Sequence, residues 1–513
     1  MKIQLVHPPV LVHPGALTAL RPGPPLGLAY IAAALRTAGH EVSVLDALAE
    51  APTQTVPEGR LQRLGLTEEQ IVERIDPAAR AIGVTDMFSF SWPAVRSVIR
   101  AIKARHPDKI VVCGGEHFTS LPEYTMQEAP IDYVVMGEGE EIATGLFRAL
   151  EAHDFDPSKV DGVAWRRGSE IVRNGRAQRI RALDEIAWPA WDLFNLDVYD
   201  ANNFVTGIKY GKTVPILATR GCPYQCTYCS SPQMWTTRWY ARDPIDVADE
   251  ITSYVEKYDA NNFPFQDLTA IVKKKWIVDF SRELIARDLD VRWQLPSGTR
   301  CEVVDEEVAP LLWESGCRSL CYAPESGSER TRKLIKKRLK SESLTKAVKA
   351  TVRNDINITA FLVIGFPHDT AADLRETVKM VRQLARMGVE DVACPFFYPI
   401  PATELYEYLR GTGRVSLGDD FLMTPLYGHD KWLTEDRNYC EHLPAWRLTV
   451  IKYWIVANFY LTSFVSHPGR VFRLIRNLVK NREDSKMDTF LIETKRKLLR
   501  SFRKRAKPAL PAS

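Results

Sequence analysis

Strands and helices alternate in two separate stretches of this chain, and this alternation constrains the fold more than any other feature. In the first stretch, short apolar or β-branched runs at residues 3–6, 41–45, 81–84 and 110–112 are separated by helical patterns such as residues 25–36. Strands that alternate with helices pair in parallel. The first 150 residues therefore predict a doubly wound, Rossmann-like α/β domain, whose ligands bind beyond the carboxyl ends of the strands.

The alternation returns between residue 214 and about residue 409. Its candidate strands lie at residues 215–219, 263–267, 292–295, 319–322, 358–364 and 391–396. Six βα units predict a (β/α)6-type partial barrel with its chemistry at the carboxyl ends of the strands. We therefore divide the chain into an α/β domain (1–150), a structured linker (151–210), a barrel (211–410) and a helical C-terminal region (411–513).

Cysteine content and charge limit the class of protein. Nine cysteines, an odd number, argue against a disulfide-stabilised secreted protein. The N-terminus lacks the basic flank and cleavage site of a signal peptide, and no run of about 18 apolar residues predicts a membrane-spanning helix. We expect a cytoplasmic protein with reduced cysteines. Its formal net charge of +4 does not indicate nucleic-acid binding.

Three cysteines follow the first predicted barrel strand directly. Cys222, Cys226 and Cys229 have the spacing C-x3-C-x2-C. Thiolates are the usual ligands of iron–sulfur clusters, and three of them leave the fourth iron of a [4Fe–4S] cluster open to another ligand. Structural zinc would need a fourth cysteine or histidine nearby, and the sequence has none there. Three unrelated cysteines on one loop are the alternative, but the spacing and the position favour a cluster.

This loop resembles that of the radical S-adenosylmethionine superfamily, whose C-x3-C-x-aromatic-C pattern is matched by the three cysteines and Tyr228. Further segments resemble the family at later strand ends: Phe265-Gln266-Asp267, Glu325-Ser326-Gly327-Ser328, Ile364-Gly365-Phe366-Pro367, and residues 398–405, in which Pro401-Ala402 replaces Pro-Gly. The resemblance implies that the open iron binds S-adenosylmethionine and that Tyr228, Asp267, Glu325 and Ser326 position it. An alternative role for Glu325 is a carboxylate at a helix N-terminus.

The first domain resembles the cobalamin-binding domain that precedes the barrel in many radical enzymes. The resemblance lies in residues 24–42, 114–123 and 131–140, which include the loops Gly114-Gly115-Glu116-His117 and Gly137-Glu138-Gly139-Glu140. It implies that Gly114, Gly115, His117, Gly137 and Gly139 lie near cobalamin. Ordinary βα turns would explain the glycines equally, and a polar loop residue would explain His117. The D-x-H-x-x-G motif for a lower axial histidine is absent, so that ligand is not assigned.

The other six cysteines form no second cluster motif. They are Cys113, Cys301, Cys317, Cys321, Cys394 and Cys440, and we interpret them as buried structural residues. Methylthiotransferases carry three further cysteines in the N-terminal domain, whereas here only Cys113 precedes the main motif. This argues against a methylthiotransferase.

The C-terminal tail is strongly basic. Residues 470–507 contain 14 Lys and Arg against 4 Asp and Glu, a net charge of +10, so the rest of the chain carries −6. Residues 450–465 are apolar and aromatic but too short to span a membrane, and in residues 470–480 we expect Val471, Leu474, Ile475 and Leu478 on one helical face. A basic amphipathic helix of this kind favours an anionic membrane surface. Packing on the barrel is the alternative, and nucleic-acid binding is less favoured.

Together these features predict a cobalamin-dependent radical S-adenosylmethionine enzyme that methylates an unactivated carbon. By resemblance, one S-adenosylmethionine methylates the reduced cobalamin, and a second yields the radical that abstracts a substrate hydrogen. The basic tail suggests a lipid-like substrate, and the whole pattern resembles bacterial hopanoid C-3 methylases. An electron donor such as flavodoxin or ferredoxin is expected. The alternatives are a ring-forming enzyme similar to the anaerobic magnesium-protoporphyrin cyclases and, in another class, a cobalamin-binding sensor or carrier.

Overall fold

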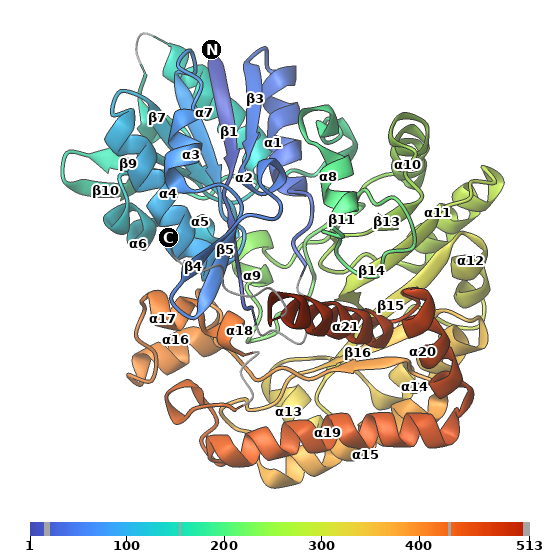
Figure 1. The fold of residues 1–513 in the computed structure, drawn as a ribbon. Coiled ribbons are helices and arrows are strands. Elements are labelled where there is room, and N and C mark those ends of the chain that lie inside the picture. Colours follow the sequence, from blue (N-terminus) through green and yellow to red (C-terminus); the bar gives the residue numbers. More distant parts are fainter. Residues whose placement is uncertain (15–20, 153–154, 429–431, 506–513) are drawn as a thin grey trace.

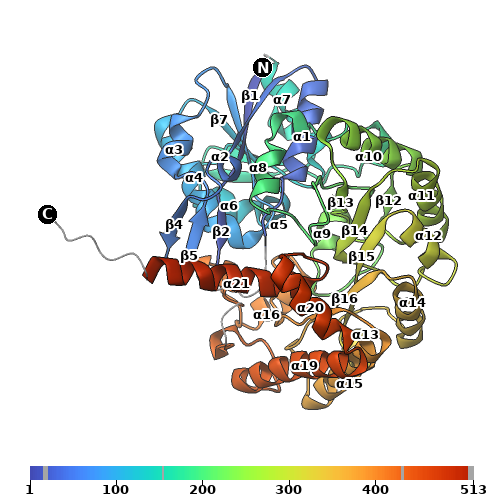
Figure 2. The same cartoon turned by 45° about the vertical axis from the view of Figure 1, so that its right-hand side comes forward.

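The computed structural model describes residues 1–14, 21–152, 155–428 and 432–505, with side chains up to residue 496 in the last helix. Two large sheets form the N-terminal and central parts of the molecule (Figure 1). Long helices of the C-terminal region lie against the central sheet, as the rotated view in Figure 2 also shows.

The N-terminal sheet has seven strands in the order β10-β9-β8-β7-β6-β1-β3. Its parallel strands are β1 (Lys2–His7), β3 (Glu41–Asp46), β6 (Ala81–Thr85), β7 (Ile110–Gly114) and β8 (Tyr133–Val135). Neighbouring residues of a strand point to opposite faces. Leu5 therefore joins the core under α1 (Leu26–Thr37) and α7 (Gly139–Glu151), whereas Val6 joins the core under α3 (Glu68–Glu73) and α4 (Trp92–Arg105). Helices on both faces confirm the predicted doubly wound fold.

Residues 162–173 predict a small hairpin within the linker, whereas the structure adds this hairpin to the N-terminal sheet and also shows a second small sheet that was not predicted. The hairpin of β9 (Val163–Arg167) and β10 (Glu170–Arg173) pairs antiparallel with β8, so the sheet continues past residue 150. A separate small sheet has the order β2-β5-β4, formed by Val10–Val12, Leu61–Leu64 and Thr55–Glu58. These strands are too short and polar to show a clear alternation in the sequence.

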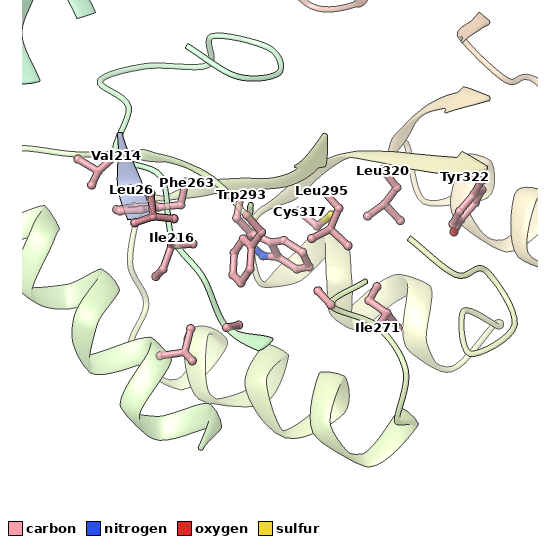
Figure 3. Packing of buried hydrophobic residues seen from close by; sticks show 14 of the residues in the cluster. Leu26, Val214, Ile216, Phe263, Ile271, Trp293, Leu295, Cys317, Leu320 and Tyr322 are labelled. Carbon is pink, nitrogen blue, oxygen red and sulfur yellow. The ribbon is translucent and has the colours of Figure 1, made fainter. Parts of the chain in front are cut away.

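The central sheet is parallel, with β13 (Asn262–Pro264), β14 (Arg292–Thr299), β15 (Cys317–Glu325), β16 (Asn357–Leu362) and β17 (Asp391–Ala393) in consecutive order. A sixth segment is added at its edge, where Thr213 and Ile216 form parallel bridges to Asn262 and Phe265. Figure 3 shows buried Phe263, Trp293, Leu295 and Leu320 on the side of this sheet that faces the helices. Those helices are α10 (Pro244–Tyr258), α11 (Lys274–Ala286), α12 (Val308–Glu314), α14 (Ser341–Arg353) and α15 (Ala371–Met387), and the (β/α)6-type partial barrel is confirmed.

The C-terminal region is helical, as predicted. It contains α16 (Glu404–Gly411), α17 (Asp419–Leu422), α18 (Thr424–Tyr427), α19 (Ala445–Ser466), α20 (Gly469–Lys480) and α21 (Lys486–Arg505). The N-terminus of α21 is fixed to the barrel, because the carboxylate of Asp391 in β17 accepts hydrogen bonds from the backbone N–H groups of Lys486 and Met487 (2.9 and 3.1 Å). The tail is thus partly an integral element of the fold.

Helix α19 is longer than the apolar segment expected from the sequence. By length and composition alone it is the one helix among the described residues that could cross a membrane. It packs along α15 with Leu448, Ile455 and Phe459 fully buried. A helix that packs on a protein core passes the same test of length and composition, so α19 by itself is weak evidence for a membrane span.

Candidate cluster and cofactor site

The cysteine loop starts where the first barrel segment ends. Thr219–Arg220 forms β11, and residues 221–230 lead to α9 (Ser231–Trp235). Gly221 has φ +86°, and a side chain there would come within 2.2 Å of the Arg238 carbonyl oxygen, so only glycine fits. The Thr227 N–H donates to the Ile335 carbonyl (3.1 Å), and the Thr227 carbonyl accepts from the Leu405 N–H (2.9 Å). The loop is therefore held by two distant segments of the barrel.

The three predicted cysteines share this loop and are half-buried. Burial, with a smaller contribution from the neighbouring Cys226 and Cys222, raises the pKa of the Cys229 thiol to about 12. Burial also raises the pKa of Cys222, while nearby Lys337 and Arg300 act in the opposite direction. Thiols in such surroundings become thiolates only with a strongly positive group between them.

The same donor set argues against a mononuclear ion. Within the described ranges, no three His, Cys, Asp or Glu side chains converge as ligands of one metal ion would. Three thiols on one loop are the donor set of a cluster with one iron left open, whereas structural zinc takes four ligands. The residues present therefore fit a polynuclear iron–sulfur cluster.

A hydrogen-bonded group lies beside the loop at the end of β15. The Tyr228 hydroxyl donates to Glu325 Oε1 (2.8 Å), and Lys337 Nζ donates to the same oxygen (3.1 Å). Glu325 adopts the left-handed conformation (φ +64°), which is unfavourable for a residue with a side chain and is often found at functional sites. Burial alone would lower the pKa of Lys337, but the charges of Glu325 and Cys226 raise it. Lys337 thus stays cationic.

Lys337 was not identified from the sequence. It lies in the basic run 336–338, which looks like a solvated surface until the fold turns this lysine toward Glu325. No motif marks Lys337; only knowledge of which side chains after Ser328 point back toward Glu325 would have identified it.

Asp267 and Ser326 are two further residues predicted to position S-adenosylmethionine. Both are buried, and their side chains form hydrogen bonds with nearby residues of the barrel. The Asp267 carboxylate accepts from the Thr219 N–H (2.6 Å), the Thr219 hydroxyl (2.5 Å) and the Ala218 N–H (3.2 Å), and burial raises its pKa to about 6. Asp267 therefore anchors the strand that leads into the cysteine loop. Ser326 Oγ accepts from the Ser328 N–H (3.1 Å). Their contact with S-adenosylmethionine stays a prediction.

The predicted cobalamin glycines lie at the carboxyl ends of β7 and β8. Gly115 has φ +118°, and a side chain would come within 2.3 Å of the Asp86 carbonyl oxygen. A Cβ on Gly139 would lie 2.7 Å from Ile31 Cδ1, whereas Gly114 has ordinary contacts. Gly137 has φ +100° in more open surroundings. Packing within the domain explains Gly115 and Gly139 without a ligand.

His117 offers a polar atom with no internal partner. Its ring is buried, Nδ1 lies 2.9 Å from the Ser89 hydroxyl, and burial lowers its pKa to about 3, so the imidazole is neutral. In the described part of the chain, His117 Nε2 and Asp86 Oδ2 have no hydrogen-bond partner. Burial raises the pKa of Asp86 to about 8. Many other buried polar atoms of the described residues also lack a partner, so these two leave donor and acceptor capacity near β7 but do not by themselves mark a ligand contact.

The fold and the site together define a radical S-adenosylmethionine barrel preceded by a doubly wound cofactor domain. Comparisons with known proteins agree: residues 12–147 match the B12 binding domain and residues 216–381 match the Radical SAM superfamily. The chain belongs to the cobalamin-dependent radical S-adenosylmethionine methyltransferases. It is an enzyme that uses a [4Fe–4S] cluster, S-adenosylmethionine and cobalamin, which confirms the predicted cofactors and excludes the sensor or carrier.

Three relatives show the extent of the similarity. An uncharacterized methyltransferase of Pyrococcus horikoshii is 30% identical over 409 residues, covering 80% of this chain and 83% of that protein. An anaerobic magnesium-protoporphyrin IX monomethyl ester cyclase of Synechocystis is 30% identical over 459 residues, covering 87% and 83%. The solved structure of the methyltransferase TsrM from Kitasatospora setae, with cobalamin and a [4Fe–4S] cluster bound, has a TM-score of 0.64 at 20% identity and covers 81% and 79%; it shows a shared fold.

Proposed function

We propose that this enzyme methylates an unactivated carbon of a lipid-like substrate at a membrane surface, and that the substrate is a hopanoid methylated at C-3. The observation that carries the membrane part is an exposed apolar face on α19 and α20. The hopanoid part rests on the resemblance of the sequence to the hopanoid methylases.

In this proposal Cys222, Cys226 and Cys229 hold the cluster, and Tyr228, Asp267, Glu325 and Ser326 position S-adenosylmethionine. Gly114, Gly115, His117, Gly137 and Gly139 line the cobalamin site. The four-part division of the chain at residues 150, 210 and 410 is retained as a proposal, with the β9–β10 hairpin of the linker extending the N-terminal sheet. When bound, the cluster with S-adenosylmethionine supplies a radical able to abstract hydrogen, and cobalamin supplies the methyl group.

The residues around the cysteine loop prepare the site for an amino acid ligand. Lys337 places a positive charge and Glu325 a negative charge beside the loop, 3.1 Å apart. A zwitterionic amino acid group needs both signs of charge. The Tyr228 hydroxyl, because it donates to Glu325, keeps that carboxylate in one orientation.

The apolar face of α20 differs from the one expected. Leu474 and Leu478, which we expected to face lipid, are turned toward the protein. Val471 and Ile475 of the expected face are exposed, and Phe472 and Val479 are exposed with them. On α19 the exposed large apolar side chains are Trp446, Val450, Tyr453, Trp454, Leu461 and Val465. Large apolar side chains concentrated on adjacent helices are typical of interaction surfaces, and tryptophan is enriched at membrane interfaces.

Basic side chains lie beside the exposed apolar residues of α20. Arg476 and Lys480 are exposed beside Ile475 and Val479. An apolar surface flanked by positive charge matches an anionic lipid surface better than a neutral protein partner. An enzyme that docks in this way could take a hydrophobic substrate directly from the bilayer.

The substrate is tested by anaerobic incubation of the reconstituted enzyme with methyl-labelled S-adenosylmethionine and candidate lipids. Mass-spectrometric detection of a hopanoid carrying the labelled methyl group at C-3 supports the full proposal. Label in another lipid retains the lipid class and removes the hopanoid. A ring-closed product without label would instead place the enzyme with the cyclases, three of which are among its relatives.

A further inference from the structure

A buried ionic cluster connects the cysteine loop to the cobalamin-binding domain. Arg220 immediately precedes Gly221 and Cys222. Its guanidinium donates to both carboxylate oxygens of Glu140 (Nη2 to Oε1 2.5 Å, Nη1 to Oε2 3.1 Å) and to Glu138 Oε1 (3.3 Å). All three side chains are less than a tenth exposed. Glu138 ends the loop after β8 and Glu140 lies in the first turn of α7, about 80 residues earlier in the chain.

Glu138, in the loop after β8, is also linked to the other end of the cysteine loop. Glu138 Oε2 accepts from Arg179 Nε (2.6 Å) and from the Ile180 N–H (3.0 Å). Arg179 Nη1 in turn donates to the carbonyl oxygens of Trp235 and Arg238, which follow the last cysteine. One carboxylate of the N-terminal domain is therefore linked to both flanks of residues 221–234.

A third contact lies at the last cysteine itself. The hydroxyl of Ser230, next to Cys229, donates to the carboxylate of Glu116. Glu116 opens α5 (Glu116–Ser120) and is the residue between Gly115 and His117. Both loops expected to approach cobalamin are thus bonded to the loop expected to hold the cluster.

Burying a guanidinium between two carboxylates has a large desolvation cost, so such a cluster contributes little net stability. Bidentate charge-assisted hydrogen bonds fix orientation strongly. We infer that Arg220, Glu138 and Glu140 are positioning residues that hold the cysteine loop at one place and angle against the cobalamin-binding domain, and so set the separation of the two cofactors. The inference depends on the proposed cluster ligands Cys222, Cys226 and Cys229 only for the position of the cluster.

The test compares two matched substitutions. E140Q removes one carboxylate charge and leaves Arg220 paired with Glu138. E250Q does the same within the barrel, where fully buried Glu250 pairs with Arg242, which keeps Asp246. Hydrogen exchange of the full chain is followed at residues 137–142 and 221–235. For E140Q we expect exchange to rise about tenfold in both segments, because a shared contact is lost. E250Q should leave residues 137–142 unchanged.

A second measurement uses the reconstituted enzyme. The magnetic interaction between cob(II)alamin and the reduced cluster, observed by electron paramagnetic resonance, reports their separation. It should weaken or broaden in E140Q and stay as in the wild type in E250Q, with iron content measured in parallel. Unchanged exchange at residues 221–235 together with an unchanged magnetic interaction in E140Q would overturn the inference. If E140Q does not fold, E138Q, which leaves Arg220 bonded to Glu140, is measured in the same way.

A failure of the cysteine assignment would look different. In that case replacing Cys226 would leave the iron content intact, whatever the result for Glu140. The two statements can therefore fail independently.

Discussion

The exposed face of α20 gives the sharpest test of membrane docking. Phe472, Ile475 and Val479 are 75%, 59% and 73% exposed, so a triple substitution with serine leaves the protein core unchanged. Full burial of such side chains contributes about 1.5–3 kcal/mol each. Insertion at a bilayer interface buries them only in part, so we take about 1 kcal/mol each, below the range for full burial, which gives about 3 kcal/mol for the three. That corresponds to a loss of about 100-fold in partitioning.

The assay is flotation of the full chain with vesicles that contain anionic lipid. I245S is the matched control, because Ile245 is 55% exposed on α10, far along the chain from the proposed face. We expect the triple variant to stay with the soluble fraction and I245S to float like the wild type. Equal flotation of wild type and triple variant, or an equal loss in I245S, would refute the docking face. Deleting residues 470–513 is a poorer test, since it would remove the N-terminus of α21 from Asp391 in the barrel.

Three further predictions concern the sites. C226A should lose cluster iron and S-adenosylmethionine cleavage together, whereas C321A should keep both; cleavage by C226A would refute the cluster assignment. Asp86 has a pKa of about 8 in the folded protein against 3.8 in the unfolded chain, so it binds an extra proton when folded, and stability falls as the pH rises from about 4 to 8. The melting temperature of D86N relative to wild type should therefore increase over this range, and a constant difference would contradict the role of burial. G115A should lower the free energy of unfolding by at least about 1–3 kcal/mol, the cost of its positive φ alone, because the added Cβ would also press on the Asp86 carbonyl; G145A, on an open helical position, should be neutral or stabilising in urea titrations.

The sequence was sufficient for elements whose pattern is local. The six barrel strands, the doubly wound sheet and the position of the cysteine loop depend on short runs of apolar residues followed by turns, and the structure has them where they were expected. The β9–β10 hairpin was recognised, but its partner was not, because pairing with β8 depends on contacts that no local pattern encodes.

The site was less predictable because its key contacts join distant residues. Lys337 and Tyr228 both donate hydrogen bonds to Glu325, and Arg220 donates to Glu140, which lies 80 positions earlier. No sequence motif contains either set of residues. Helical periodicity correctly predicted an amphipathic α20 but could not decide which apolar residues face the protein. Leu474 lies inward because Arg470 and Arg473, on the same side of the helix, pair with Glu390 of the barrel.

Those ion pairs change the balance of forces expected for the tail. The count of +10 over residues 470–507 assumed that every basic side chain is available to a membrane. Arg470 and Arg473 both pair with Glu390, which offsets one of their two positive charges and holds both side chains against the barrel, and Lys486 lies against Cys321 and Phe361. Residues 506–513, and the side chains from 497 onward, lie outside the described structure.

On α20 the charge that can reach lipid is mainly that of Arg476 and Lys480, about 2 kcal/mol at roughly 1 kcal/mol each. This is smaller than the contribution of about 3 kcal/mol worked out above for the three apolar side chains. Docking through α20 should therefore depend more on Phe472, Ile475 and Val479 than on ionic strength, and a steep loss of flotation with salt would assign the attraction to the basic residues beyond α20.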